Sequence, residues 1–417
     1  MLTSGVYAIL RLGYDIIPPL RPRLAPRLAL DLAAGPAKPL IHFHASSVGE
    51  ISSIAPVVSE AARAFPGHAL LVTTMTATGM RRAAEVLPGT EVRLLPFDFK
   101  PAMQRFVRTL KPAVTIIAET ELWPNLLREA RRRDTSLVLV NGRISTKSIR
   151  RYLRLRRLVR SMLSQFDLLL MRSAEDADRA IMLGADPERV VVTGNTKYDV
   201  LPGPMEEERR RALKERLGLA WGRPVIILGS ARDGETEVLL RGLEALDSGA
   251  VPAVVIAPRH LENVPRFDAA LRRAGYTVRL SAAGAGDGPA ELLGEREAIM
   301  VNEMGRLLEY YAVSDIAVLG GTFAPHGGHN PLEPASQGAV VVVGPYRDNI
   351  ADDMEYLMGE NGVVITDGAG LGGTLRDLIA DPARMEATAQ RASCAVRARK
   401  GASLRSLEAM KSAGVFK

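Results

Sequence analysis

The sequence is poor in cysteine and in aromatic residues. Cys394 is the single cysteine, and the 417 residues include only two Trp, nine Tyr and nine Phe. One cysteine excludes an internal disulfide and leaves no cysteine cluster for zinc, which predicts a reducing compartment. The scattered aromatic residues form no recognition motif for nucleic acid, so nucleic-acid binding is disfavoured.

The composition is otherwise that of a soluble globular protein, with 47% hydrophobic and 24% charged residues. A chain of this length predicts two domains of about 200 residues each. The net charge of +7 favours an anionic partner. A phosphorylated lipid and an acidic membrane face both fit this charge.

No long uncharged apolar run opens the chain. Residues 2–20 are apolar, but Arg11 and Asp15 interrupt them and Pro18-Pro19 ends them. They are too short and too charged to predict a membrane span. Two interpretations of the segment 1–38 stay open: a helix lying in the membrane interface, or a helix packed on its own domain. In the first, four arginines face anionic head groups: Arg11, Arg21, Arg23 and Arg27.

After Pro39 the chain alternates between short apolar strands and helices, which is typical of a parallel, doubly wound sheet. The alternation restarts after Pro202-Gly203-Pro204. We therefore predict two Rossmann-like α/β domains facing across a cleft, residues 39–201 and residues 205–417. Residues 282–290 are predicted to form a loop. The main predicted strands are residues 40–44, 70–74, 92–95, 113–118, 136–140, 225–228, 253–256, 316–319 and 340–343.

A glycine-rich stretch, residues 320–335, follows one of these strands and leads into a helix predicted to begin at Pro331. Glycines let backbone N–H groups approach a ligand, and a helix N-terminus adds unpaired donors and a partial positive charge. The stretch therefore predicts a phosphate site, with Glu333 placed to reach ribose hydroxyls. The alternative is a glycine-rich turn that binds no ligand.

Carboxylates follow two strands of the first domain, at the sheet edge where ligands of open α/β sheets bind. Glu50, three residues after Ser47, is either half of a capping box or a general base. Glu119 and Glu121 follow the strand at 113–118. Two carboxylates at this position are not expected to serve packing alone.

Basic residues follow other strands. Arg143, Lys197 and Arg259 are each either an anion ligand or a surface charge, and their shared position after strands favours the first. Residues 147–160 contain seven Lys or Arg among fourteen. This run is either a solvated helix face or a contact with lipid phosphates, each cation contributing about 1 kcal/mol near an anionic surface.

Six motifs, in their order and spacing, resemble those of the 3-deoxy-D-manno-octulosonic acid (Kdo) transferases, which are GT-B glycosyltransferases of lipopolysaccharide assembly. The resemblance runs from about residue 40 to about residue 400. The motifs are residues 44–50 (HASSVGE), 119–125 (ETELWPN), 141–145 (NGRIS), 194–199 (GNTKYD), 258–260 (PRH) and 327–333 (GGHNPLE).

The resemblance implies inverting transfer of Kdo from the donor CMP-Kdo to a phosphorylated lipid A precursor, without a metal or other cofactor. It also implies a peripheral or N-terminally anchored enzyme on the cytoplasmic face of the inner membrane. Glu50 would accept the proton of the acceptor hydroxyl, and Glu119 and Lys197 would stabilise the transition state. The residues expected to hold CMP are Pro258, Arg259, Met304, Gly305, Arg306, Gly327, Gly328, Asn330, Pro331, Leu332 and Glu333.

Three departures from the family pattern keep alternatives open. Arg306 stands where the family usually has Glu, residues 21–38 lack the family's basic, aromatic motif, and residues 230–235 follow the family's loop only loosely. One alternative is a GT-B transferase or epimerase that uses another nucleotide sugar. The other is a non-catalytic, membrane-associated relative.

Overall fold

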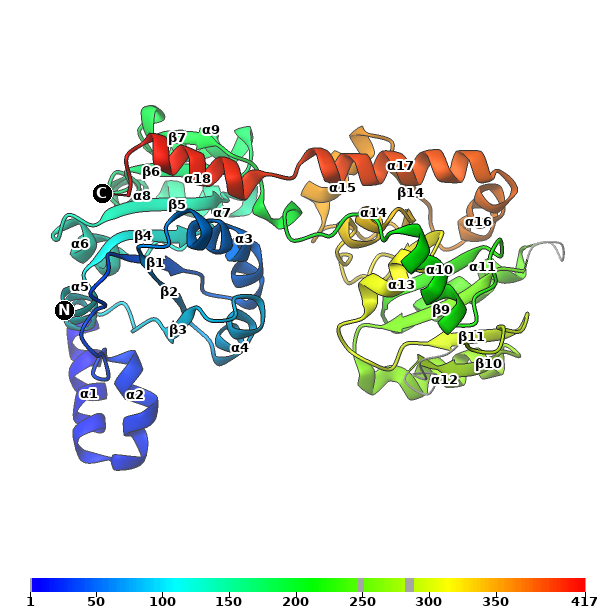
Figure 1. Cartoon of the computed structure of the whole chain (residues 1–417), viewed down its shortest axis with the longest axis horizontal. Helices are drawn as coiled ribbons and strands as arrows, with labels where there is room; N and C mark the ends of the chain where they lie inside the picture. The colour runs from blue at the N-terminus through cyan, green and yellow to red at the C-terminus, as the bar shows by residue number, and fades with distance from the viewer. Residues whose placement is uncertain (1, 247–250, 282–288, 417) are drawn as a thin grey trace. The chain divides into compact units, whose positions relative to one another are not determined.

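The computed structural model describes residues 2–246, 251–281 and 289–416. These form two compact units, Met1–Val200 with Arg399–Lys417, and Leu201–Ala398 (Figure 1). Residues 282–288 of the predicted loop at 282–290 lie outside the described residues.

The first unit contains a seven-stranded parallel sheet in the order β3-β2-β1-β4-β5-β6-β7. The strands are β1 (Leu40–His44), β2 (Ala69–Thr74), β3 (Glu91–Leu94), β4 (Pro112–Ala118), β5 (Ser136–Gly142), β6 (Leu168–Met171) and β7 (Val190–Val192). The helices are α1 (Leu2–Ile16), η1 (Pro18–Leu20), α2 (Arg21–Arg27), α3 (Val48–Ala64), α4 (Ala77–Val86), α5 (Lys100–Leu110), α6 (Pro124–Arg131), α7 (Thr146–Arg154), α8 (Arg156–Leu163), α9 (Ala174–Met182), η2 (Pro187–Arg189), η3 (Thr196–Tyr198) and α18 (Ala402–Ser412).

The second unit contains another seven-stranded parallel sheet, in the order β10-β11-β9-β8-β12-β13-β14. The strands are β8 (Val225–Ala231), β9 (Ala253–Pro258), β10 (Thr277–Leu280), β11 (Glu297–Met300), β12 (Ile316–Leu319), β13 (Val340–Val343) and β14 (Val363–Ile365). The helices are α10 (Glu207–Arg216), α11 (Glu235–Glu244), η4 (Leu261–Asn263), α12 (Val264–Arg273), α13 (Leu307–Val313), α14 (Leu332–Gln337), α15 (Ala351–Gly359), α16 (Leu371–Ala380) and α17 (Pro382–Ala398).

Each sheet is buried on both faces, as its apolar strands predict. In β5, Leu137 and Leu139 belong to one hydrophobic cluster of the first unit, whereas Val138 and Val140 belong to the other. Successive side chains of a strand point to opposite faces, so helices must cover both. The predicted α/β class with two parallel sheets is therefore confirmed.

The strand orders place a topological switch point in each unit. In the first unit the chain returns to the middle of the sheet between β1 and β4, and in the second between β8 and β12. The loops that follow the two strands at such a point diverge and leave a crevice where ligands of open α/β sheets bind. Glu50 and Glu119 follow the first pair of strands, and the glycine-rich stretch follows β12.

Residues 399–417 correct the domain boundary predicted from the sequence, which assigned them to the second domain. Asp199 accepts hydrogen bonds from the backbone N–H groups of Gly401 (2.6 Å) and Ser403 (2.7 Å) and so caps the start of α18. Leu407 and Met410 of α18 then join the core beneath α3. The end of the chain therefore belongs to the first unit.

The N-terminal segment forms a helical hairpin of α1 and α2 (Figure 1). Across the described residues, no helix has the length and apolar character to cross a membrane. Arg27 does not face outward as predicted, because its guanidinium donates to the carbonyls of Leu95 and Met75 in its own unit. The other predicted head-group contacts of this segment stay predictions.

Candidate active site

Glu50 lies in the first turn of α3, directly after β1. Its Oε2 accepts a hydrogen bond from the backbone N–H of Ser46 at 2.8 Å, and its Oε1 accepts from the Ser47 hydroxyl at 2.9 Å. The Ser47 Oγ also accepts from the Glu50 N–H at 3.3 Å and caps the helix. The helix cap by Ser47 considered from the sequence does form, but the carboxylate accepts from the Ser46 N–H and the Ser47 hydroxyl rather than completing a capping box at the Ser47 N–H. Both carboxylate oxygens are held in place.

Burial raises the pKa of Glu50 to about 7, and the nearby carboxylates of Glu121 and Glu119 add to this rise. The hydrogen bonds from Ser46 and Ser47 act in the opposite direction, because they stabilise the charged form. A carboxylate with a pKa near neutrality is a much better proton acceptor than one at 4.5. Capping therefore does not account for the whole environment of this residue.

Glu119 is the residue after β4, and its backbone has a φ of 53°. Left-handed backbone at a residue other than glycine costs free energy and is concentrated at functional sites. Burial raises the pKa of Glu119, while the cations of Arg143, Arg172 and Lys197 oppose that rise. The structure thus brings two of the predicted catalytic residues, Glu119 and Lys197, into one electrostatic cluster.

A cavity of about 310 Å³ opens beside Glu119. It is strongly polar, which suits a sugar better than an apolar ligand. Its lining comes from the loop after β4, the loop after β5 and helix α7: Glu119, Thr120, Glu121, Arg143, Ser145, Ser148 and Tyr152.

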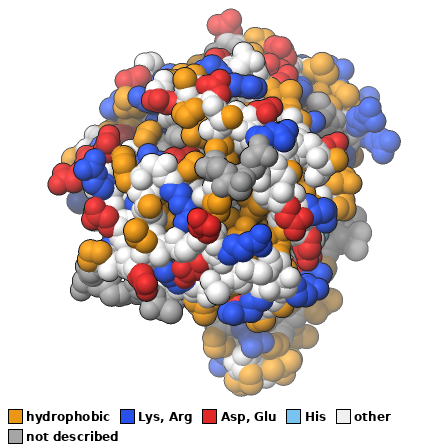
Figure 2. Space-filling view, turned by 90° about the vertical axis from the view of Figure 1, so that its right-hand side faces the viewer, with side chains coloured by type: hydrophobic (Ala, Val, Ile, Leu, Met, Phe, Trp, Pro, Cys, Tyr) orange, Lys and Arg blue, Asp and Glu red, His pale blue; other side chains and the backbone are white. Residues whose placement is uncertain are grey.

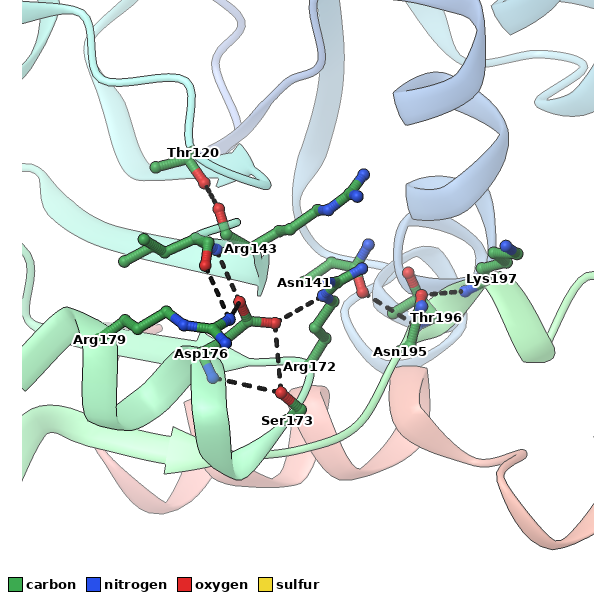
Figure 3. Close-up of polar contacts among 11 residues, drawn as sticks. Thr120, Asn141, Arg143, Arg172, Ser173, Asp176, Arg179, Asn195, Thr196 and Lys197 are labelled. Atoms are coloured by element: carbon green, nitrogen blue, oxygen red, sulfur yellow. Dashed lines mark hydrogen bonds and ion pairs between the residues drawn. The ribbon is translucent and has the colours of Figure 1, made fainter. Parts of the chain in front are cut away.

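Buried Asp176 fixes the loop after β5 that carries Arg143. Its carboxylate accepts from the N–H of Ile144 at 2.8 Å and from the guanidinium of Arg172 at 2.6 Å. The Arg179 guanidinium also donates to the Ile144 carbonyl, at 3.0 Å (Figure 3). The backbone of the loop that carries Arg143 is therefore held by buried or partly buried hydrogen bonds.

Lys197 lies in the short helix η3 after β7. Asn195 accepts a hydrogen bond from the Lys197 backbone N–H at 3.0 Å, and Asn141 accepts from the N–H of Thr196 at 3.1 Å (Figure 3). These asparagines belong to the motifs at 141–145 and 194–199. Asn141 joins the end of β5 to the turn after β7, and Asn195 stabilises that turn locally. These contacts hold the turn through the backbone N–H groups of Thr196 and Lys197.

In the second unit, buried Glu235 organises the switch point. Its carboxylate accepts from three backbone N–H groups, those of Arg232 (2.8 Å), Gly321 (2.9 Å) and Phe323 (3.0 Å). It therefore joins the loop after β8 to the glycine-rich stretch after β12. This role was not predicted from the sequence, because Glu235 and Gly321 are 86 residues apart.

The glycine-rich stretch uses a backbone N–H group for a hydrogen bond within its own loop, whereas the sequence predicted that such groups approach a ligand. The Gly328 N–H donates to the Gly321 carbonyl at 2.7 Å. Gly327 and Gly328 have φ values of 81° and 86°, and a Cβ atom would meet Asn349 at the first and Ile350 at the second. These glycines are required for the turn itself.

The motif continues into the six-residue helix α14, which begins at Leu332, one residue later than predicted. Asn330 accepts from the Leu332 N–H at 3.1 Å through Oδ1 and donates to Glu333 Oε1 at 3.1 Å through its amide. Asn330 thereby orients the carboxylate that was predicted to reach a ribose.

Arginine and histidine side chains gather beside this loop. Arg232 donates to Nε2 of His329 at 3.2 Å and lies 3.2 Å from Nε2 of His260. The pKa of His329 falls to about 4, first because of burial and then because of the cations of Arg259 and Arg232. The neutral imidazole can therefore accept the hydrogen bond from Arg232. Of this cluster, which can bind an anion, only Arg259 was predicted.

The chain resembles known proteins over most of its length. Residues 22–200 match a family model described as 3-deoxy-D-manno-octulosonic-acid transferase (kdotransferase). A 3-deoxy-D-manno-octulosonic acid transferase of Bordetella pertussis is 32% identical over 398 residues, which are 91% of this chain and 88% of the relative. The chain belongs to the Kdo transferase family.

A second member of this family, from Haemophilus influenzae, is 31% identical over 353 residues, 83% of this chain and 80% of the relative. A bifunctional glycosyltransferase/methyltransferase of Fusobacterium nucleatum is also 31% identical, over 330 residues. That match covers 78% of this chain but only 50% of the Fusobacterium protein. The predicted assignment to a glycosyltransferase family is confirmed.

Solved structures support the GT-B fold. A UDP-GlcNAc 2-epimerase from Neisseria meningitidis gives a TM-score of 0.60 at 13% identity, covering 89% of this chain and 99% of its own. A glycosyltransferase from Rickettsia africae gives 0.59 at 11% identity, covering 92% and 100%. At such identities the similarity concerns the fold alone.

In this Kdo transferase, Arg306 stands where the family usually has Glu, and two neighbouring glutamates neutralise its positive charge. Its guanidinium pairs with Glu303 at 2.9 Å and with Glu309 at 2.7 Å. These three side chains together carry one net negative charge, so the reversal does not make this turn basic. Met304 is 69% exposed, and Gly305 next to it has a φ of 87°.

Proposed function

We propose that this chain transfers Kdo from CMP-Kdo to a phosphorylated lipid A precursor, with inversion and without a metal ion. The observation that carries the proposal is Glu50, a carboxylate held through both oxygens at a switch point with its pKa raised to about 7. Glu50 takes the proton of the acceptor hydroxyl as the oxygen attacks the anomeric carbon. CMP leaves from the opposite side, so this single displacement inverts the centre.

On the donor side, the phosphate of CMP is neutralised by arginines. Arg259 was predicted for this role, and Arg232, held by its contacts with His329 and His260, is added to it. One guanidinium group can donate two parallel hydrogen bonds to two oxygens of the same phosphate. The two arginines thus supply the positive charge that a metal ion supplies in other transferases. We assign the cytidine and ribose to the segments 304–306 and 330–333.

On the acceptor side, the polar cavity beside Glu119 accommodates a sugar of the precursor. Helix α7 contributes Ser148 and Tyr152 to the cavity, and with α8 it carries the basic run. The apolar side chains of the run are 42 to 53% exposed at Leu153, Leu155 and Leu158. Arginines interleaved with exposed leucines suit a phosphorylated, acylated acceptor better than a purely solvated face.

We also propose that the α1–α2 hairpin docks on the anionic cytoplasmic face of the inner membrane. Figure 2 shows hydrophobic side chains gathered on this hairpin, at the bottom of the view. Five of them are 44 to 71% exposed: Val6, Ile9, Leu12, Ile16 and Ile17. An exposed apolar stripe beside arginines is typical of interfacial helices.

Replacing Ile9 and Leu12 together with Asp is expected to reduce cosedimentation with phosphatidylglycerol vesicles at least about 10-fold, because each apolar side chain contributes about 1.5 kcal/mol or more when buried. Leu404→Asp is the control, since Leu404 is 50% exposed on α18 of the same unit. Equal vesicle binding of both variants and the wild type would contradict the docking.

The transfer itself is tested by incubating the full chain with labelled Kdo as CMP-Kdo and a tetraacylated lipid A precursor, with and without EDTA. Lipid-linked Kdo of inverted configuration in both samples is expected. Loss of product with EDTA would contradict the metal-independent mechanism. If product forms only from another nucleotide sugar, such as a UDP-sugar, the donor assignment is wrong.

A further inference from the structure

Two buried histidines connect the interior of the first sheet to the site of Glu50. His42 and His44 point from β1 to the same face and have no exposed surface. The Thr73 Oγ1 of β2 lies 2.8 Å from Nε2 of His42 and 3.0 Å from Nδ1 of His44. At the far end, the Thr115 hydroxyl lies 3.3 Å from Nδ1 of His42.

The hydrogen bonds assign one tautomer to each imidazole. Burial lowers the pKa of both histidines to about 3, so both rings are neutral and each carries one N–H. The Thr73 hydroxyl donates to the Phe43 carbonyl at 3.3 Å, so it accepts from both rings. The Nε2 atom of His44 is therefore unprotonated and accepts the hydroxyl hydrogen of Ser46 at 3.2 Å.

Ser46 is thus held at each of its polar groups. Its hydroxyl is bound to His44, and its carbonyl accepts from the Thr74 hydroxyl at 3.1 Å and from the Met75 N–H at 3.3 Å. Its remaining group, the backbone N–H, donates to Glu50 Oε2 at 2.8 Å. Any change of the backbone angles at Ser46 would move the hydrogen bond that orients the carboxylate.

We propose that His44 and Ser46 are positioning residues for Glu50: the neutral imidazole fixes the Ser46 hydroxyl, and the fixed peptide N–H holds the carboxylate in the orientation that accepts the proton. This inference rests on the proposed role of Glu50 as the base. Neither residue contacts the substrate in this scheme. His44 therefore acts through hydrogen bonding and not as an acid or base.

The test uses Ser46→Ala, which removes only the hydroxyl that His44 holds. We expect kcat for Kdo transfer to fall about 10-fold or more, because small displacements of a catalytic group cost up to about 100-fold. The KM for CMP-Kdo and the affinity for CMP should stay at wild-type values. Ser46→Thr, which retains the hydroxyl, should restore most of kcat. Thr115→Val is the control, since it removes a hydroxyl from the other end of the same buried chain.

A double-substitution cycle separates positioning from simple destabilisation. In a Glu50→Gln background, Ser46→Ala should lower kcat no further, because there is no carboxylate left to orient. The inference is overturned if Ser46→Ala leaves kcat within twofold of the wild type, if Thr115→Val lowers it equally, or if the two losses multiply. Absence of product from the folded wild type would instead overturn the proposed function, and this inference with it.

Discussion

Glu50→Gln is expected to lower kcat for Kdo transfer by about 10² to 10⁴-fold, the usual contribution of a positioned general base. The amide keeps the size of the side chain but cannot accept the proton, and its oxygen can still receive the bond from Ser46 or Ser47. The fold and the KM for CMP-Kdo should therefore be retained. Both parameters are read from initial rates of product formation at saturating acceptor.

Glu60→Gln is the matched control, because Glu60 lies on the same helix but forms a surface ion pair with Arg63. It should behave as the wild type. If Glu50→Gln retains more than a tenth of the wild-type kcat, Glu50 is not the base. The result would then favour a different catalytic residue or a non-catalytic protein.

The pH dependence gives a second measure of the same group. Only the deprotonated carboxylate accepts a proton, so kcat/KM should fall about tenfold per pH unit below about 7 and level off above it. Glu121→Gln should move this midpoint to lower pH, because the Glu121 carboxylate raises the pKa of Glu50. A midpoint near 4.5 in the wild type would contradict the assignment.

The fold was largely predictable because the strands of a buried parallel sheet are short apolar runs separated by helices. The prediction missed β6, β10, β11 and β14, of which β10 and β14 lie at the two edges of the second sheet. A run such as residues 168–171 (LLLM) is too short for periodicity to separate a strand from a helix. The return of α18 to the first unit rests on Asp199, whose capping role depends on residues more than 200 positions away.

The candidate site was predictable where one rule applied, that ligands of open α/β sheets bind beyond the carboxyl ends of the strands. Glu50, Glu119 and Lys197 follow from it. The contacts of Arg232 and Glu235 do not, because they depend on which loops meet across the second sheet. Nor does the sequence tell whether a glycine N–H faces a ligand or, as at Gly328, a carbonyl of the same loop. The neutralisation of the Arg306 charge could have been predicted from the sequence, since glutamates stand three residues before and after it.

Lys197→Met is expected to lower kcat by about 10² to 10³-fold, the typical cost of removing one group that stabilises charge in a transition state. The substitution is well suited to the purpose, because η3 is held through the backbone N–H groups of Lys197 and Thr196, which methionine leaves intact. Only the ammonium is lost. Thermal unfolding checks that the fold is retained, and initial rates with saturating CMP-Kdo and acceptor report the loss in kcat.

Lys197→Arg separates charge from geometry. It restores a positive charge, but a planar guanidinium cannot reproduce a compact ammonium, so we expect only partial recovery. Loss of the cation should also raise the pKa of Glu119, because Lys197 is one of the charges that lower it. Arg143 and Arg172 would then be the cations that still oppose the rise of this pKa. If Lys197→Met and Lys197→Arg both retain the kcat of the wild type, the ammonium does not stabilise the transition state. The cations around Glu119 would then serve only to hold the acceptor cavity.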